Sequence, residues 1–505
     1  MRGVLVAGAA AAMLAGCSID PPDPSLPAAA TALPDRYAEA GDVAGRYEPV
    51  EWWQSYEDPV LDVLVDRALA ANLDIEEAVA RIEEVEARYD RERAALFPQV
   101  SAGLEANYAN QPATGLGAAL GEATRGGQNG GGGGSAGGAT APADTGTRRF
   151  SFSTYTARLQ ASWEADIWGR LRNRARAADA NLAASVAELQ AVRIRVASEV
   201  MRNYFDLVET EQLRDLGELQ AEILGERVTF AERAFLRGIG SSFELISLRE
   251  SRREVEAGLP LLEARLTRSK ARLGVLLGTY PEDVDHALAQ AGLLEVHLPM
   301  EAVPAGLPVR LLERRPDIVA ARARLDAARF GVAAAEAARL PQLTLNASGG
   351  LEGNEPSGAF DPRNWFVNLL GALTAPIFDA GRIGAQIDIN EAQMRQRAVA
   401  YGRTVLDAFA EVESALARHE AAADRVRLIE ADLGSARQAA DLQLRRFERG
   451  TGGYSDWLDA RLNVLNSRRL MVEAERAVAE ARLDVHRVLG GAWKRKWLAR
   501  ADSDV

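Results

Sequence analysis

The feature that most constrains the fold of this 505-residue chain is an internal duplication. An Asp-Ile pair at Asp74, and again at Asp317, opens an Ala/Glu/Arg-rich stretch that ends in a Pro-Gln pair at Pro98 and at Pro341. The number of residues from Asp74 to Pro98 equals the number from Asp317 to Pro341, so the two segments align without a gap. The two segments therefore read as copies of one structural element.

A second pair of matching segments lies further along each copy. Gly238 ends the sequence Phe-Leu-Arg-Gly and Gly450 ends Phe-Glu-Arg-Gly, and another glycine follows each at the same distance, at Gly278 and Gly490. Chance rarely produces two gap-free matches in the same order. The sequence therefore predicts two copies of one unit, each of about two hundred residues or more.

Each copy has the same predicted layout: a helix, a strand, a loop, a second strand, a very long helix, a turn and another long helix. Repeat 1 is assigned to residues 51–280, with strands near 98–110 and 150–165 and a helical hairpin at 170–278. Repeat 2 is assigned to residues 308–491, with strands near 341–353 and 364–377 and a hairpin at 382–489. The remaining segments are a signal peptide at 1–16, an extended linker at 17–50, a connecting segment at 281–307 and a C-terminal tail at 492–505.

The predicted strands alternate between apolar and polar residues, which is typical of strands with one apolar face. This alternation alone also fits soluble β-hairpins. Aromatic residues gather at the strand ends next to the helices, at Phe97, Trp163, Trp168 and Phe378, and at the ends next to the loops, at Tyr108, Phe150, Phe152, Trp365 and Phe366. Two aromatic girdles around a short apolar band favour transmembrane β-strands.

The two loops between paired strands differ in length and composition. The first, at about 110–147, is rich in glycine, a composition that cannot bury a core and predicts mobility. No Lys-Ser or Lys-Thr pair follows its glycines, so it is not a phosphate-binding loop. The second loop, at 353–363, is short. Both are expected to face outward from the cell.

Four transmembrane strands cannot close a barrel, because about eight are the practical minimum. An open sheet in lipid leaves two edges of unsatisfied backbone groups, each of which costs several kcal/mol. Identical chains are therefore expected to pool their strands. Three chains give twelve strands, whereas two give eight, and an eight-stranded barrel has an interior largely filled by side chains.

The helices impose a second requirement for partners. The stretch from Arg170 to Arg237 contains no proline and keeps helical spacing of its apolar residues, as does the equivalent stretch from Arg382 to Arg449. At about 1.5 Å per residue, each helix is on the order of 100 Å long. Helices of this length and Ala/Leu/Glu/Arg composition need neighbours along their length, which predicts coiled-coil packing into a helical tube.

The first seventeen residues form an export signal. Arg2 precedes an apolar run from Val4 to Leu14, which is too short to span a membrane, and small residues lead to Cys17, the only cysteine. This arrangement resembles the lipobox of bacterial lipoproteins, in which Cys17 is lipidated and becomes the mature N-terminus. The alternative is an ordinary signal with an incidental cysteine. Ser18, in place of an aspartate, favours the outer membrane over the inner membrane.

Composition and motifs argue against several other classes of function. The net charge is -13 and no basic stretch stands apart from neighbouring acids, which argues against nucleic-acid binding. No zinc motif, nucleophile elbow or dinucleotide fingerprint is present. The four histidines are scattered without ligand spacing, at His286, His297, His419 and His486. The sequence predicts neither catalysis, nor a metal site, nor a cofactor.

Three segments resemble the TolC-like outer membrane factors of tripartite efflux pumps, in their lipid-anchored branch. They are the Glu-Trp-Trp-Gln-Ser-Tyr run from Glu51, the Trp-Glu-Ala-Asp-Ile-Trp-Gly-Arg run from Trp163 with its counterpart Ala375–Ile383, and the Arg-Arg-Pro-Asp-Ile run from Arg314. The resemblance implies a trimer in the outer membrane, with a twelve-stranded β-barrel that continues into a twelve-helix periplasmic tunnel. It also implies two partners, a periplasmic adaptor (membrane fusion protein) and an RND-type inner-membrane transporter, which selects the cargo.

The resemblance places the mechanistic residues at the two helical turns, where the tunnel narrows and the adaptor docks. These turn residues are Arg237, Gly238 and Gly240 in the first copy and Arg449, Gly450, Gly452 and Gly453 in the second. Asp456 and Asp459 match positions where family members place acidic rings around the aperture, so three copies would attract cations there. The alternative is that both aspartates favour the first turn of a helix.

Two further residues at these turns bear on the same resemblance. Phe447 and Gly452 replace a tyrosine and an arginine that form gate-holding links in some relatives, so a latch of that kind is not expected here. Ser241 with Glu244 fits a capping box at the start of the next helix.

Two alternatives remain open at the level of sequence. One is the outer membrane channel of a type I protein secretion system, which the predicted lipid anchor disfavours. The other is a lipid-anchored periplasmic coiled-coil scaffold without a pore, whose β-hairpins would be soluble.

Overall fold

The computed structural model describes residues 18–38, 51–112, 149–284, 303–304 and 308–491. The predicted signal peptide and Cys17 lie outside the described residues, as do parts of the linker (39–50) and of the connecting segment (285–302 and 305–307). Most of the glycine-rich loop (113–148) and the C-terminal tail (492–505) also lie outside them.

The chain divides into two compact units. The sheet unit contains the described parts of Met1–Asp20, Asp90–Ala175 and Ala333–Ile387. The helical unit contains the described parts of Pro21–Tyr89, Arg176–Val332 and Asp388–Val505.

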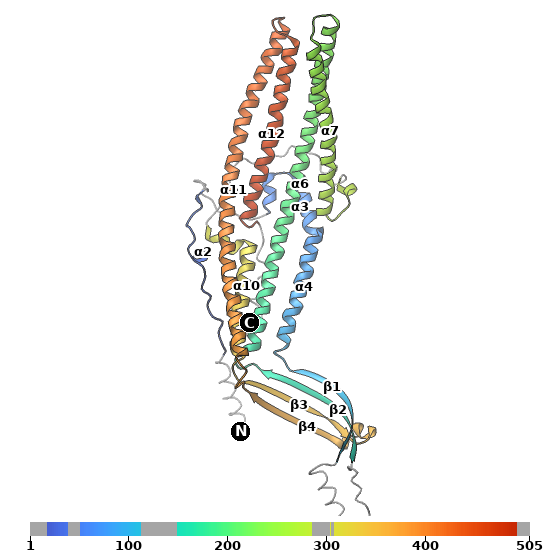
Figure 1. Ribbon diagram of the computed structural model, residues 1–505, viewed down its shortest axis with the longest axis vertical. Coiled ribbons are helices and arrows are strands. Elements are labelled where there is room, and N and C mark those ends of the chain that lie inside the picture. Colours follow the sequence, from blue (N-terminus) through green and yellow to red (C-terminus); the bar gives the residue numbers. More distant parts are fainter. Residues whose placement is uncertain (1–17, 39–50, 113–148, 285–302, 305–307, 492–505) are drawn as a thin grey trace, which may run out of the picture. The chain divides into compact units, whose positions relative to one another are not determined.

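The described part of the sheet unit holds four antiparallel strands in the order β1-β2-β3-β4 (Figure 1). They are β1 (Gln99–Pro112), β2 (Arg149–Ala165), β3 (Gln342–Gly353) and β4 (Trp365–Thr374). Strand β4 ends before the predicted 377 because Pro376 lacks the N–H that a ladder needs. Each strand pairs with its neighbour in sequence, and β1 and β4 form the two edges of the described sheet.

The register of the strands gathers the apolar residues on one face. Leu104 lies opposite Ala157, Ala157 lies opposite Leu351, and Leu351 lies opposite Trp365. Because side chains alternate along a strand, residues two positions away in each strand share this face. We call it the apolar face; its side chains include Val100, Leu104, Tyr108, Leu159, Trp365, Leu369 and Leu373, all of them exposed.

The aromatic residues at the loop end are divided between the two faces of the sheet. Tyr108 and Trp365 lie on the apolar face, whereas Phe152 lies opposite Ala109, and Phe366 lies opposite Gly350, on the other face. The side chain of Phe150 lies outside the described residues. The sequence analysis assigned these aromatic residues to a girdle by their position along the strands. The register shows that Phe152 and Phe366 do not lie on the apolar face and so do not belong to an apolar girdle.

The helices reproduce the predicted duplication in their lengths. Helices α4 (Leu73–Ala94) and α10 (Pro316–Ala337) have 22 residues each. The long helices α6 (Arg170–Leu236) and α11 (Arg382–Glu448) have 67 residues each. Helices α7 (Ser242–Leu276) and α12 (Tyr454–Val488) have 35 residues each. A duplicated, mostly helical fold is therefore confirmed.

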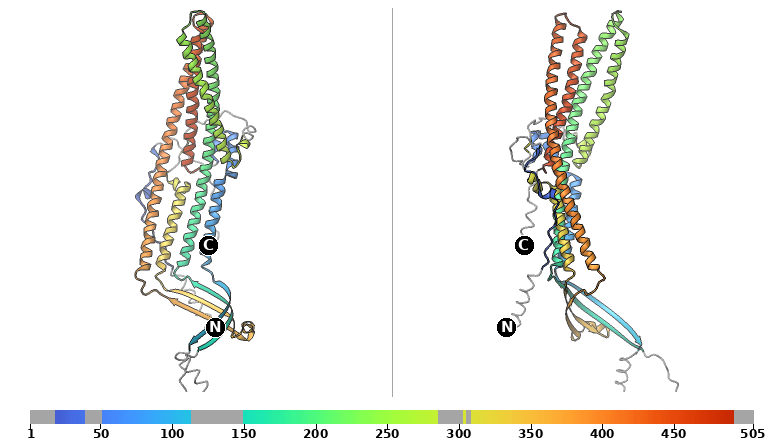
Figure 2. Two further views of the ribbon diagram at one scale, coloured as in Figure 1. Left: turned by 45° about the vertical axis from the view of Figure 1, so that its right-hand side comes forward. Right: turned by 60° about the vertical axis from the view of Figure 1, so that its left-hand side comes forward.

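Figure 2 shows α6 beside α7 and α11 beside α12 as two long antiparallel hairpins. None of the described helices combines the length and the apolar character needed to cross a membrane. The shorter elements are α2 (Ala28–Thr31), η2 (Trp52–Tyr56), α3 (Pro59–Ala71), η3 (Pro308–Arg310), α9 (Leu311–Arg314), η4 (Pro356–Phe360) and η5 (Pro362–Asn364).

One hydrophobic core of the helical unit forms around the start of α3. The Asp58 carboxylate caps α3 by accepting hydrogen bonds from the backbone N–H groups of Val60 and Leu61, at 2.9 and 3.2 Å. It also accepts a hydrogen bond of 2.6 Å from the buried hydroxyl of Tyr204 on α6. The cap thus fixes α3 against α6, where Leu61 is fully buried.

A buried histidine on α12 packs against the start of the structured chain. The ring of His486 stacks on that of Trp52, with centroids 5.3 Å apart. Burial, together with the smaller effect of the charges of Arg482 and His419, lowers the pKa of His486 to about 3. The imidazole is therefore neutral in the folded protein at neutral pH.

We predict that acid destabilises the helical unit through His486. The unfolded chain takes up a proton at the ordinary histidine pKa of 6.5, whereas the fold excludes that proton until about pH 3. The unfolded state then binds more protons, so stability falls as pH drops below 6.5, by roughly 2 kcal/mol between pH 7 and pH 5. Thermal unfolding at the two pH values should show a smaller difference for His486→Phe, which keeps the stacked ring; an equal difference would contradict this account.

We predict opposite effects for two glycine substitutions, one just after the end of α7 and one in its middle. Gly278 has a φ of 65°, and an added Cβ would lie 2.3 Å from the carbonyl oxygen of Ala71. Gly278→Ala should therefore lower the stability of the helical unit by about 2 kcal/mol or more. Gly258 lies inside α7 with nothing within 4 Å of an added Cβ, so Gly258→Ala should raise stability by up to about 1 kcal/mol. Thermal unfolding followed by circular dichroism measures both.

Candidate functional site

The candidate site lies at the two turns that close the long helical hairpins, which we call the tip turns. They are residues 237–241 between α6 and α7 and residues 449–453 between α11 and α12. Figure 1 shows both at the same end of the helical unit. Arg237 and Arg449 are exposed in these turns.

The two tip turns end their helices with the same backbone hydrogen bonds. The N–H of Gly238 donates to the carbonyl of Phe235 at 2.9 Å, and that of Gly450 donates to Phe447 at 2.9 Å. The next residue donates to a carbonyl five positions back, from Ile239 in one turn and from Thr451 in the other. This pattern is the glycine-terminated helix end known as a Schellman motif, and φ values of 73° at Gly238 and 69° at Gly450 require glycine.

A second glycine in each turn is required by close approach. A Cβ added at Gly240 would lie 2.7 Å from the backbone nitrogen of Phe235. A Cβ added at Gly452 would lie 2.9 Å from the Cβ of Arg446. Both turns therefore fold back tightly on the preceding helix, and their shapes are fixed by the positions of their glycines.

The helices that leave the two turns are capped in different ways. At α7 the Ser241 hydroxyl accepts a hydrogen bond of 3.2 Å from the N–H of Phe243. At α12 the N-cap residue Gly453 has no side chain, and its own N–H donates instead to the carboxylate of Asp456 at 3.1 Å. Each helix thus uses one half of a capping box. The exposed Asp456 has the structural role that the sequence offered as its alternative.

Asp459, the second predicted aperture residue, forms an ion pair within its own chain. Its carboxylate lies 2.5 Å from the guanidinium of Arg227 on α6. One turn earlier on α12, the hydroxyl of Tyr454 donates a hydrogen bond of 3.1 Å to Glu226, also on α6. Burial and this contact with Glu226 raise the pKa of Tyr454 above its ordinary value. We call these two links, Arg227–Asp459 and Glu226–Tyr454, the tip clasp.

Aromatic and apolar packing surrounds the tip clasp. The ring of Tyr454 lies 5.2 Å from that of Phe447, 5.4 Å from that of Trp457 and 6.0 Å from that of Phe230. Below it, Ile223 on α6 and Leu458 on α12 are buried against each other. The tip clasp therefore joins one helix of each hairpin at a partly desolvated position.

The sequence did not identify Tyr454, Glu226 or Arg227 as site residues. Their partners lie on a helix more than two hundred residues away, and periodicity within one helix does not fix its register against another. The structure brings Asp456 and Asp459 together on the first turns of α12. Among the described residues, no hydrogen bond or ion pair joins the two tip turns to each other.

A cluster of charged residues links three helices further along the shaft. Arg265 on α7 pairs with Asp206 and Glu209 on α6, at 2.5 and 2.6 Å. Arg476 on α12 pairs with the same Glu209 at 3.1 Å. Burial opposes the charge of Asp206, but hydrogen bonds from Arg265 and Ser269 lower its pKa below the ordinary value. This cluster ties α6, α7 and α12 together.

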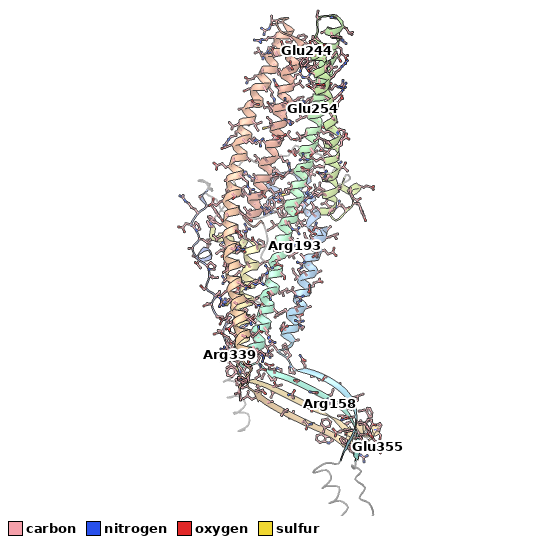
Figure 3. The ribbon with its side chains drawn as sticks, viewed as in Figure 1. Arg158, Arg193, Glu244, Glu254, Arg339 and Glu355 are labelled. Carbon is pink, nitrogen blue, oxygen red and sulfur yellow. The ribbon has the colours of Figure 1, made fainter. Side chains whose placement is uncertain are left out.

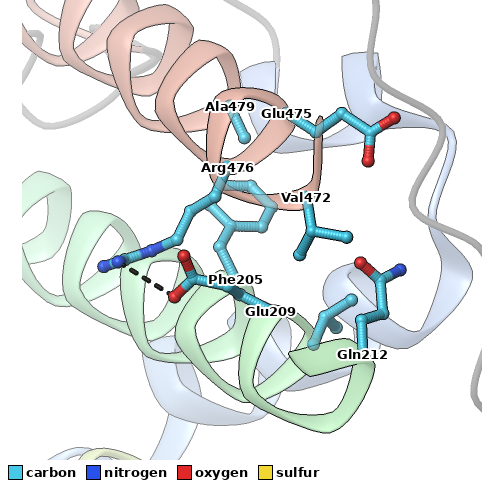
Figure 4. Close-up of a pocket in the computed structure, with 8 residues that line it drawn as sticks. Phe205, Glu209, Gln212, Val472, Glu475, Arg476 and Ala479 are labelled. Atoms are coloured by element: carbon cyan, nitrogen blue, oxygen red, sulfur yellow. Dashed lines mark hydrogen bonds and ion pairs between the residues drawn. The ribbon is translucent and has the colours of Figure 1, made fainter. Parts of the chain in front are cut away.

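A small cavity of about 40 Å³ adjoins this cluster (Figure 4). Its polar lining is Glu209, Gln212, Glu475 and Arg476, and Glu209 and Arg476 pair with each other there. The volume has room for only a few water molecules, so we assign no ligand to the cavity. Within the described residues, no group of His, Cys, Asp and Glu side chains could hold a metal ion.

Two β-hairpins in one sheet, joined in a repeated chain to two long helical hairpins with glycine-closed tips, are the architecture of known outer-membrane channels. The family model described as outer membrane efflux protein matches residues 64–279 and 307–491, most of the chain. The chain belongs to the outer membrane efflux protein family, and it is an efflux protein of the outer membrane.

Similarity to individual proteins supports the family assignment and extends over nearly the whole chain. The pyoverdine export outer membrane protein OpmQ of Pseudomonas putida is 29% identical over 444 residues, 88% of each protein. The cation efflux system protein CusC of Escherichia coli is 26% identical over 487 residues, 95% of this chain and 97% of CusC. The structure of the outer-membrane channel OprN matches with a TM-score of 0.79 at 24% identity, over 94% of this chain and all of that one, which establishes the shared fold. The family is one of transport ducts.

We predict a measurable coupling between Arg227 and Asp459. The Arg227 side chain is 15% exposed and the Asp459 side chain 50%, so the pair should contribute about 1 kcal/mol in a double-mutant cycle with alanine. The matched control is the more exposed pair of Arg249 and Glu232, which also joins two helices, and whose coupling should be near zero. Thermal unfolding of each cycle gives both values, and equal couplings would argue against a tip clasp.

Proposed function

We propose that this protein is the exit duct of a tripartite efflux pump, and that it works as a homotrimer that conducts cargo passively out of the cell. The observation that carries the proposal is the open four-stranded sheet of the described chain, with its exposed apolar face and its two edge strands. In lipid, unpaired backbone groups along β1 and β4 cost several kcal/mol each. Pairing β4 of one chain with β1 of the next removes both edges.

Three copies are the number we propose for the closed barrel. They supply twelve strands, an even number in the range of known outer-membrane barrels. They also supply six long helical hairpins. Each helix of these hairpins is about 50 Å long or more, and in the trimer it gains neighbours along its length. The proposed trimer is thus a twelve-stranded barrel continued by a tunnel of twelve helices.

Two protein partners follow from the same proposal, a periplasmic adaptor and an RND-type inner-membrane transporter. The tip turn between α6 and α7 supports adaptor docking, because it exposes Leu236, Ile239 and Phe243, each about 80% accessible. An exposed apolar patch of this kind is typical of an interaction surface. We place docking at this turn and at the turn of Arg449–Gly453, and we assign the choice of cargo to the transporter.

The names of relatives are consistent with that division of labour. OpmQ is named for pyoverdine export and CusC for cation efflux, although both match nearly all of this chain. A shared duct that serves different cargoes points to selection elsewhere in the pump. We further propose that the duct performs no catalysis.

Lipid anchoring at Cys17 is part of the proposal. The signal at 1–16 would direct export, and the linker from 17 to 50 would connect the lipid to the structured chain. The supporting observation is the sequence of small residues ahead of the cysteine.

Asp456 and Asp459 are proposed to line a narrow aperture at the tip of the trimer. Both are exposed, which fits this role. Arg227 offsets one of the two charges in each chain, so the proposed ring carries less charge than the aspartates alone would give. The tip clasp is proposed to hold α12 against α6 when the aperture is closed.

Planar bilayers with the purified protein test the proposal. Single-channel currents should favour cations and be blocked by divalent cations, and the double variant Asp456→Asn with Asp459→Asn should lose much of both, because it removes six carboxylates from a trimer.

The matched control is Glu244→Gln, at the equivalent position of the first repeat, labelled near the tip in Figure 3. It should leave both properties unchanged. Absence of any conductance would contradict the duct itself, whereas unchanged selectivity in the double variant would contradict only the aperture.

A further inference from the structure

The face of the sheet opposite the apolar face carries charged side chains at defined register positions. Glu105 on β1, Arg158 on β2 and Glu352 on β3 all lie on this polar face. An arginine on the lipid side would cost about 2–4 kcal/mol at the bilayer midplane. In the proposed trimer the polar face must therefore line the lumen, and the inference below rests on that proposed function.

The register places the two carboxylates at one level of the sheet. Glu105 lies opposite Thr156, and Thr156 lies opposite Glu352, so the glutamates occupy equivalent positions on either side of β2. Neighbouring strands are about 4.8 Å apart, which puts the two backbone positions about 10 Å apart. A trimer would carry six such carboxylates, two from each chain.

Arg158 lies two residues along β2 from this level, between two glycines. Its register partners are Gly103 on β1 and Gly350 on β3, neither of which has a side chain to cover it. An added Cβ at Gly103 would meet nothing within 4 Å, so there is open space beside the arginine. Figure 3 shows Arg158 on the sheet.

Arg158 forms an ion pair with one of the two glutamates, Glu105. A guanidinium nitrogen of Arg158 lies 3.3 Å from a carboxylate oxygen of Glu105, and both side chains are about half exposed. Among the residues that the structure describes, no ion pair is formed by Glu352. Each chain therefore contributes one balanced pair and one unbalanced carboxylate.

We propose that Glu105, Arg158 and Glu352 form a lumenal charge layer that is a second determinant of ion preference, separate in sequence from the tip aspartates. Glu352 makes the layer attractive to cations and to cargo with exposed positive charge. Arg158, held by Glu105 and flanked by glycines, limits that attraction and lets anions pass. The two residues thus act in opposite directions, which a simple acidic ring would not do.

Side-specific block in planar bilayers tests the proposal, with hexaamminecobalt(III) as the trivalent cation probe. It is added on the side that the loops face, so that it meets the strands before the tip turns. Glu352→Gln should weaken the block about threefold or more, and Arg158→Gln should strengthen it by a similar factor. Arg158→Lys keeps the charge and should leave the block unchanged.

The matched control is Glu355→Gln, the same chemical change just beyond the end of β3, where Figure 3 labels Glu355. It should leave the block unchanged. Conducting channels whose block responds to neither Glu352→Gln nor Arg158→Gln overturn the charge layer and leave the duct intact. A wild-type protein that forms no channels overturns the proposed function instead. If Arg158→Gln fails to assemble, the comparison of Glu352→Gln with Glu355→Gln decides the question.

Discussion

The rest of this structure depends on one constraint. The outward-facing backbone groups of the two edge strands need hydrogen-bond partners. Strands β1 and β4 each have one neighbour in the described sheet, so half of their N–H and C=O groups point outward without a partner strand. Water can satisfy these groups, but a bilayer core cannot. The exposed apolar face supports our proposal that this sheet lies in lipid, where the two requirements together would call for more than one chain.

The long helices also need neighbours along their length, and the duplication supplies two hairpins of equal length in each chain. Helices of 67 and 35 residues recur in each copy, so the two hairpins have the same length and the same order of elements. The copies are not identical where function is proposed. The first tip turn exposes apolar side chains and caps its helix with Ser241, whereas the second caps its helix with Asp456 and brings Tyr454 and Asp459 to α6. This difference supports our proposal that the first copy docks the adaptor and the second holds the tip.

Much of the fold could be predicted from sequence, for physical reasons. The strands follow from period-two alternation, and the ends of the long helices follow from Gly238 and Gly450, whose positive φ values only glycine adopts easily. The face of Phe152 could also have been found by counting residues from Tyr155, because β2 runs without a bulge. The sequence analysis grouped the aromatic residues by strand end and did not apply this alternation to Phe152.

The contacts that define the tip could not be predicted in this way. Asp459 reads as a free acidic residue in sequence because its partner Arg227 lies on a helix of the other repeat, and only the packing of α6 against α12 fixes their distance. The pairing of Arg158 with Glu105 likewise depends on strand register, which the loop between β1 and β2 does not specify by its composition.

The mass and heat stability of the detergent-extracted protein test the central claim most directly. Light scattering should give a protein mass near three chains, and gel electrophoresis should show a band that changes migration only after heating, because a closed barrel resists unfolding by detergent at room temperature. A protein that dissolves in water without detergent as a single chain of about 54.3 kDa or less, with no heat-dependent shift, would contradict the shared barrel.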